Sequence, residues 1–317
     1  MNLSQDVLDW LLDPENPSVR YRTLTELLGA REDDPEVRQA RADIPTSKPV
    51  QKIFAKMHPE GYWLHRGVGD GVSYAMSSST HFVLSYLAEL GLDRTDGHIS
   101  QAVERYLSLE LPDRPDPARW EIPPDYRNHQ SCLYAYNLRT FIQLGYRDDP
   151  RVQERVEVLV NDGRTDGGFL CDRPSFTVKT KSCIRGTLKA LTAFAELPEL
   201  WGSERCKALV DYFLRRQVIF KNGRPGELIR DEVATTIFPF VINASLLESL
   251  LALSRMGYGN HPALQPAWQA LNTKRDAQGR YVLDRSLNSI FNAGPNGQAN
   301  KWTTLYAYRA LSAANRL

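Results

Sequence analysis

The sequence predicts an all-α fold in which about six helical hairpins close into an (α/α)6 toroid. Three observations predict it: an apolar spacing typical of helices, two kinds of loop that recur along the chain, and apolar faces on both terminal helices. Because 42% of its residues are hydrophobic, the chain can bury a large core, and we expect residues 1–317 to form a single toroid domain.

Helical periodicity runs through most of the chain. Apolar residues recur at positions i, i+3, i+4 and i+7, which places them on one face of a helix. Val83, Leu84, Leu87 and Leu90 follow this spacing. No segment shows the clear alternation typical of a half-buried strand, so the fold is predicted to be all-α.

The first recurring loop contains Gly or Pro and ends in an aromatic or large apolar residue. It reads HPEGYW, DPARW, TDGGF, GRPGEL and DAQGRY, and its copies end at Trp63, Trp120, Phe169, Leu228 and Tyr281. Successive copies are 57, 49, 59 and 53 residues apart. A regular period of this size indicates a repeat architecture. We therefore interpret GRTDGGFLCD (163–172) as a turn between helices, with Phe169 packed between them.

The second recurring loop marks the ends of helices. The helical pattern stops at Gly29, Gly91, Gly145 and Gly257 in ELLGA, ELGLD, QLGYR and RMGYG. Glycine just after a helix is a common stop, because it adopts the left-handed conformation without steric cost. An N-cap residue, often followed by proline as in Asp149–Pro150, then begins the next helix.

These two loops divide the chain into inner and outer helices. We expect inner helices at 17–28, 74–90, 129–144, 180–197, 236–256 and 301–316. We expect outer helices at 35–43 with 48–57, 98–110, 150–161, 203–217 and 262–273. The N-terminal helix, about 3–13, supplies the sixth outer helix and closes the ring against the C-terminal helix. An open solenoid would instead need polar terminal repeats.

Charge and composition exclude several classes of function. The formal net charge is +1 without a basic cluster, which argues against nucleic acid as a partner. The four cysteines are not closely spaced, as is typical of a reducing compartment. The start of the chain does not resemble a signal peptide, and no apolar run is long enough for a transmembrane segment. We expect a cytoplasmic protein whose oligomeric state stays open.

The loops TDGGF and DAQGRY resemble the QW-type motif of the squalene-cyclase and protein-prenyltransferase β-subunit superfamily. The segment QANKWTTLYAYRAL (298–311) is similar to the last repeat of the short bacterial single-domain members of that superfamily. The resemblance covers the chain from about residue 17 onward. It implies an isoprenoid-processing protein, terpene cyclase-like or prenyltransferase-like, that binds a small apolar, isoprenoid-like ligand in a central cavity.

The chain also departs from this superfamily. The first Gln of the motif is mostly absent, and the signatures DxDD and Asp-x-Cys are missing. The alternative is therefore a non-catalytic toroid, a binding or scaffold protein that has lost cyclase or transferase chemistry.

Several polar and aromatic residues are candidates for the cavity, because the N-terminal halves of the inner helices should line it. The expected substrate-binding residues are Tyr74, His81, Tyr136, Lys181, Arg185, Trp302 and Tyr306. The expected catalytic residues are Asp231 and His129.

Two further chemistries are open. Cys171, Cys183 and Cys132 could ligate a metal, since thiolates are zinc ligands, but free cysteine is also common as a small buried residue. The cofactor is undetermined, with zinc and magnesium as candidates. A carbohydrate-active toroid would use paired carboxylates across the cavity, for which Asp231 or Glu232 with Asp172 could serve.

Overall fold

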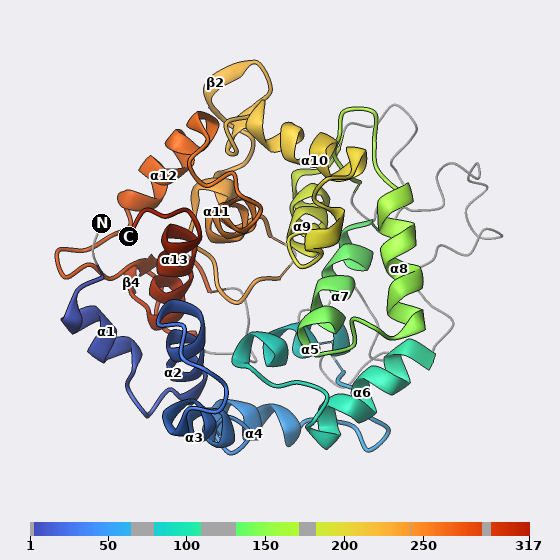
Figure 1. Ribbon diagram of the computed structural model, residues 1–317, viewed down its shortest axis with the longest axis vertical. Coiled ribbons are helices and arrows are strands. Elements are labelled where there is room, and N and C mark those ends of the chain that lie inside the picture. Colours follow the sequence, from blue (N-terminus) through green and yellow to red (C-terminus); the bar gives the residue numbers. More distant parts are fainter. Residues whose placement is uncertain (1–2, 65–78, 109–130, 171–181, 242, 287–292) are drawn as a thin grey trace.

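The computed structural model describes residues 3–64, 79–108, 131–170, 182–241, 243–286 and 293–317. Its helices form a ring (Figure 1), which confirms the predicted all-α toroid. The inner helices are α2 (Pro17–Arg22) continued by the π-helix η1 (Thr23–Leu27), α5 (Thr80–Leu90), α7 (Ser131–Gln143), α9 (Ile184–Phe194), α11 (Leu246–Arg255) and α13 (Lys301–Ala313). The outer helices are α1 (Gln5–Leu11), α3 (Pro35–Asp43), α4 (Lys48–Phe54), α6 (Gly97–Ser108), α8 (Pro150–Asn161), α10 (Glu204–Leu214) and α12 (Gln265–Asn272).

Burial separates the two sets of helices. Every residue of α5 is buried, as expected for a helix enclosed on all sides. The outer helix α6 instead buries one stripe, formed by Ile99, Ala102, Val103, Tyr106 and Leu107. This is the helical spacing from which the hairpins were predicted.

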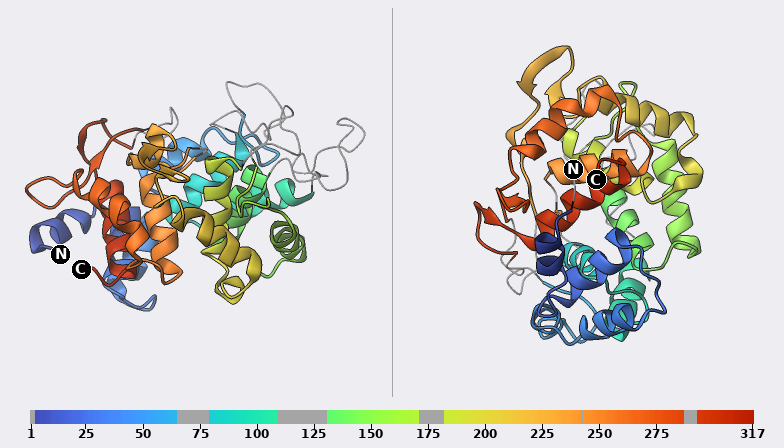
Figure 2. Two further views of the ribbon diagram at one scale, coloured as in Figure 1. Left: turned by 90° about the horizontal axis from the view of Figure 1, so that it is seen from above. Right: turned by 60° about the vertical axis from the view of Figure 1, so that its left-hand side comes forward.

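The N-terminal helix closes the ring as predicted. Figure 2 shows α1 beside α13, and the Nζ atom of Lys301 at the start of α13 lies 2.6 Å from the Oδ2 atom of Asp13. Val7 and Leu11 of α1 are fully buried in the main core. The first and last repeats therefore share one hydrophobic core.

The loop after each outer helix forms the same turn in three repeats. The backbone N–H groups of Trp63, Phe169 and Tyr281 donate to the hydroxyls of Thr80, Thr187 and Thr304, at 3.0, 3.0 and 2.8 Å. Each threonine belongs to the following inner helix. Phe169 is completely buried, so TDGGF is the turn that the sequence predicted.

Glycine is required in this turn. Gly167 has φ +86°, and a Cβ atom there would lie 2.3 Å from the carbonyl oxygen of Ala208. The helix stops predicted at Gly29, Gly91, Gly145 and Gly257 also have positive φ. Gly91 is the C-cap of α5, in the left-handed conformation.

One inner helix begins later than predicted. Residues 236–241 and 243–245 form no regular helix, and α11 begins at Leu246 rather than near 236. Pro239 cannot donate a helical hydrogen bond. In addition, the backbone N–H of Thr236 donates to Asp284 Oδ2 at 2.9 Å, which holds this segment against the neighbouring loop.

Short strands and 3₁₀-helices occur in the connections. Strand β1 (Phe220–Lys221) pairs antiparallel with β2 (Arg224–Leu228), and β3 (Val282–Leu283) pairs antiparallel with β4 (Gln298–Ala299). The 3₁₀-helices are η3 (Pro198–Leu200), η4 (Asp231–Ala234) and η5 (Pro262–Leu264). None of the helices in the described ranges is long and apolar enough to cross a bilayer.

Candidate functional site

A groove of about 880 Å³ opens where the inner helices α2 and α13 begin, and we call this side of the ring the N-terminal face. Four segments form it: the turn from α1 into α2, the chain from α3 into α4, the C-terminal half of α5, and the chain leading into α13. Its lining mixes aromatic side chains with amides, hydroxyls and charges: Trp10, Pro14, Glu15, Asn16, Pro17, Ser18, Val19, Asp43, Thr46, Ser47, Lys48, Pro49, Tyr86, Leu90, Ala293, Gly294, Pro295, Ala299, Asn300, Lys301 and Trp302.

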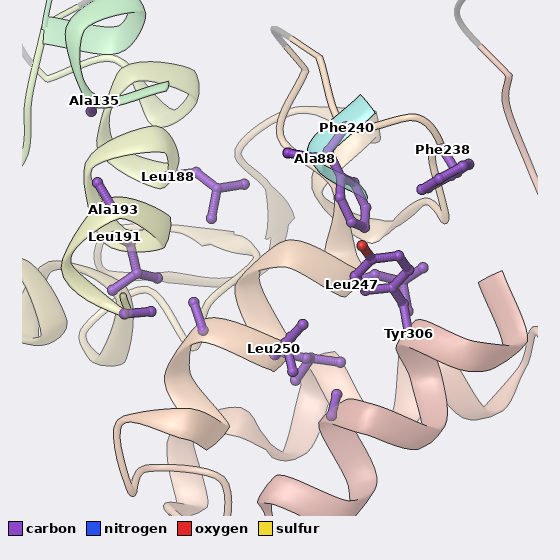
Figure 3. Close-up of a cluster of buried hydrophobic side chains, with 14 of the residues drawn as sticks. Ala88, Ala135, Leu188, Leu191, Ala193, Phe238, Phe240, Leu247, Leu250 and Tyr306 are labelled. Atoms are coloured by element: carbon purple, nitrogen blue, oxygen red, sulfur yellow. The ribbon is translucent and has the colours of Figure 1, made fainter. Parts of the chain in front are cut away.

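Aromatic side chains continue from this groove into the centre of the ring. Trp302 stacks on Phe238 with ring centroids 4.8 Å apart and an interplanar angle of 12°. Phe240 packs edge-on against Tyr306 at 4.6 Å, and Tyr136 donates a hydrogen bond of 2.8 Å to the Phe240 carbonyl. Figure 3 shows Phe238, Phe240 and Tyr306 at one end of the buried apolar cluster. These aromatic side chains pack against one another at the centre of the toroid.

A partly buried ion pair joins Glu232 of η4 to Arg185 of α9. Both carboxylate oxygens of Glu232 accept from Arg185, at 2.7 and 2.6 Å, and one also accepts from Asn243 at 2.7 Å. Burial raises the pKa of Glu232, but these hydrogen bonds outweigh it and hold the pKa below its usual value. Glu232 is therefore ionised, and its oxygens accept from Arg185 and Asn243. Because an ionised carboxylate has no proton to give, Glu232 does not suit the role of general acid.

The described substrate-binding candidates lie on the inner helices, but only Trp302 lines the groove. His81, Tyr136 and Tyr306 are buried, and Arg185 is paired with Glu232. The catalytic candidate Asp231 is exposed at the start of η4. Among the described candidates, Trp302 is therefore the one that the groove can present to a ligand.

Most of the other candidates lie outside what the structure describes. Tyr74, His129, Lys181 and Cys171 fall in undescribed segments, as do Asp172 and the side chain of Cys132. Cys183 is the N-cap residue of α9. Among the described residues, no group of three His, Cys, Asp or Glu could hold a metal ion. Zinc and magnesium binding stays a prediction.

The opposite, C-terminal face of the ring carries a network of ion pairs that the sequence did not predict. Its members lie on the six inner helices or just after them: Arg22, Glu26, Glu89, Arg139, Glu196, Arg255 and Arg309. Six helices that run in the same direction place six negative dipole ends at this face. Cations there are favourable, and Arg22 donates to the backbone carbonyls of Ala88 and Glu89 at the end of α5.

A cavity of about 430 Å³ lies within this network. It is lined by Arg22, Glu26, Gln143, Glu196, Leu251, Arg255, Arg309, Ser312 and Ala313. Arg255 binds both carboxylate oxygens of Glu196 at 2.9 Å, and Gln143 donates to one of them at 3.1 Å. Glu26 contacts both Arg22 and Arg309.

The pKa values in this network follow from burial and charge. Burial raises the pKa of Glu26, but the charges of Arg309 and Arg22 outweigh it, so the net shift is downward. In Glu196, burial is likewise outweighed by Arg255 and Arg139, and the pKa is lowered. Burial dominates at Arg309 and lowers the pKa of its guanidinium.

A weak signal of this network exists in the sequence. Glu26, Glu89, Gln143, Glu196 and Arg255 each stand two or three residues before the Gly or Pro that ends an inner helix. A polar side chain at a recurring position in five repeats indicates a shared environment. Taken singly, each resembles an ordinary solvated helix end.

Comparison with known proteins confirms the fold. No protein-family model matches the chain, and no curated protein matches it significantly. The solved structure of a glycosyl hydrolase family 88 protein from Bacteroides vulgatus matches with TM-score 0.51 and 15% identity, over 99% of each chain. A polysaccharide lyase matches with TM-score 0.49 and 13% identity, over 98% of this chain and 95% of that chain, and carries no further weight. At such identities the first match shows the fold alone.

The resemblance to the squalene-cyclase and prenyltransferase superfamily is wrong. The matched toroid is a glycosyl hydrolase and belongs to a different superfamily. The predicted isoprenoid-processing function and the predicted isoprenoid-like ligand rested on this resemblance, so both predictions are wrong as well. The alternative of a non-catalytic scaffold gains no support.

The error has a physical reason. The turns TDGGF and DAQGRY return the chain from an outer to an inner helix, and their aromatic residues anchor that return through Thr187 and Thr304. Three hairpins of this ring use such a turn to lead the chain into the next inner helix. Its glycine and aromatic residues therefore indicate the toroid and do not distinguish one toroid superfamily from another.

Proposed function

We propose that the protein is a carbohydrate-active toroid that binds a sugar chain in the groove of the N-terminal face. The observation that carries this proposal is the composition of the groove. Trp10, Tyr86 and Trp302 supply aromatic surface, and carboxylates, amides, hydroxyls and lysines surround them. A sugar ring has the matching character, because its C–H faces are apolar and its edge carries hydroxyls.

The dimensions of the groove agree with this proposal. Its volume of about 880 Å³ lies in the range of ligand-binding clefts. It extends from exposed residues such as Glu15 and Lys48 to the buried side chains of Tyr86 and Trp302. An extended ligand could therefore enter from solvent and place one unit against the aromatic floor.

The match to a glycosyl hydrolase supports the same class of ligand. Because the identity is 15%, the comparison supplies the fold, and the case for a sugar rests on the groove. Glycoside hydrolysis uses two carboxyl groups that flank the scissile bond. Glu15 and Asp43 are the exposed carboxylates among the described residues of the lining, and we propose them as the pair.

Isothermal titration of the protein with neutral and acidic oligosaccharides, such as cello-, xylo-, chito- and galacturonate oligomers, tests the proposal. We expect at least one to bind, and we expect Thr46→Trp, which fills the groove from an exposed position, to abolish that binding. Thr273→Trp is the matched control. Both threonines are exposed and donate to a carbonyl three residues earlier, but Thr273 lies outside the groove. Binding that survives Thr46→Trp, or no binding to any oligomer, would overturn the proposal.

A further inference from the structure

We propose that the cavity of the C-terminal face binds a small oxyanion that also carries a hydroxyl hydrogen, such as dihydrogen phosphate or a hydroxycarboxylate. This site is independent of the sugar groove, since the two cavities share no lining residue. Three features point to such a ligand: the charge of the lining, one arginine with spare donors and one amide with a spare acceptor.

The lining of the cavity has an excess of positive charge. Three arginines, Arg22, Arg255 and Arg309, face two carboxylates, Glu26 and Glu196, which leaves one positive charge uncompensated. A buried charge without a counter-ion is costly, because water is partly replaced by a medium of low dielectric constant. A bound monovalent anion would remove this excess.

Arg309 is the group best placed to bind the anion. Arg22 uses its donors on Glu26 and on two carbonyls of α5, and Arg255 uses two donors on Glu196. Arg309 contacts Glu26 through Nε, and its Nη1 atom has no hydrogen-bond partner in the part of the chain that the structure describes. Its side chain is only 12% exposed and lies over the ring of Tyr306. The Nη1 atom carries two N–H groups and can donate a charge-assisted hydrogen bond to an oxyanion.

Gln143 supplies an acceptor for the hydroxyl hydrogen of the ligand. Its Nε2 atom donates to Glu196, which fixes the orientation of the amide because the Glu196 carboxylate can only accept. Its Oε1 atom is buried without a hydrogen-bond partner among the described residues. This acceptor favours a ligand that brings a hydrogen, and it disfavours sulfate, which is fully deprotonated at neutral pH.

The size and opening of the cavity limit the ligand. A volume of about 430 Å³ accommodates a small anion together with several water molecules, at ~30 Å³ for each water. Solvent reaches the cavity past Arg255, whose side chain is 36% exposed. The cavity can therefore hold a compact ion or the charged end of a small molecule.

Isothermal titration and thermal unfolding with inorganic phosphate, sulfate, lactate and acetate at one ionic strength test the proposal. We expect phosphate or lactate to bind and to raise the melting temperature. The anion that binds more tightly shows whether the site is built for a phosphate or for a hydroxycarboxylate. Sulfate and acetate should bind at least tenfold more weakly. Equal weak effects of all four anions, as expected from ionic strength alone, would overturn the proposal.

Two variants locate the binding. Arg309→Gln should weaken binding by about tenfold or more, while the surface variant Arg31→Gln should leave it unchanged, since the side chain of Arg31 is 84% exposed. If Arg309→Gln does not fold, Ser312→Phe fills the cavity and leaves every ion pair in place. Retained binding in the folded Ser312→Phe variant would contradict the proposed site.

Discussion

The Nζ atom of Lys189 lies 2.6 Å from the Oε1 atom of Glu248, and the two side chains are 2% and 3% exposed. This ion pair joins α9 to α11 inside the ring. Burial raises the pKa of Glu248, and Lys189 opposes that shift. The pair thus links two inner helices through charges that water does not solvate.

Breaking this pair from one side should be costly. We expect Lys189→Met to lower the free energy of unfolding by about 3–5 kcal/mol, because it leaves the Glu248 carboxylate buried without its partner. The double variant Lys189→Met/Glu248→Leu should recover most of that loss. Urea denaturation of both variants measures the difference. If the double variant is as unstable as the single one, the instability of Lys189→Met does not come from an unpaired, buried carboxylate.

The carboxylates of the C-terminal face should make stability depend on pH. The pKa values of Glu26 and Glu196 are lower in the folded protein than their usual value of 4.5. Such groups contribute stability that is complete above the unfolded pKa and is lost as the pH falls through the folded pKa. We therefore expect the free energy of unfolding to decrease as the pH falls below about 4.5.

Glu196→Gln tests this origin. The variant should unfold more easily at pH 7, and its stability should fall less steeply in acid than that of the unchanged protein. Glu204→Gln is the control, because the side chain of Glu204 is 92% exposed. Denaturant unfolding at a series of pH values gives both slopes, and an unchanged slope in Glu196→Gln would exclude this glutamate as a source.

The turn at Gly167 should depend on its close contact as well as on its conformation. Gly167→Ala places a methyl group against the Ala208 carbonyl and should destabilise the protein by more than ~2 kcal/mol. Gly223→Ala is matched in conformation, with φ +70°, but a Cβ there meets nothing within 4 Å. It should cost only about 1 kcal/mol. Equal losses in thermal or chemical unfolding would show that the contact with α10 is unimportant.

The sequence predicts the helices well because their signals are local. The outer helix α8 was expected at 150–161, which are its bounds in the structure, since Asp149 caps it and Pro150 begins it. The start of α11 was misplaced because the apolar run Ile237–Phe238–Pro239–Phe240 resembles helix and core alike. Its true conformation depends on hydrogen bonds to Asp284, which lies 48 residues away from Thr236.

The sites are harder to predict because they join distant segments. Trp10, Asp43 and Trp302 line one groove, and no short motif contains two of them. The cavity of the C-terminal face likewise joins Arg22 to Arg309 through Glu26. Both sites form where the ring closes. Their lining residues depend on the order of the helices around the ring and on which side of each helix faces the site.

A crystal structure of the protein with the oligosaccharide that titration identifies tests the central claim most directly. We predict that a sugar ring lies in the groove of the N-terminal face and contacts Trp302 or Trp10, with Glu15 and Asp43 beside the chain. A sugar bound elsewhere, on the outer helices or in the cavity of the C-terminal face, would contradict that claim.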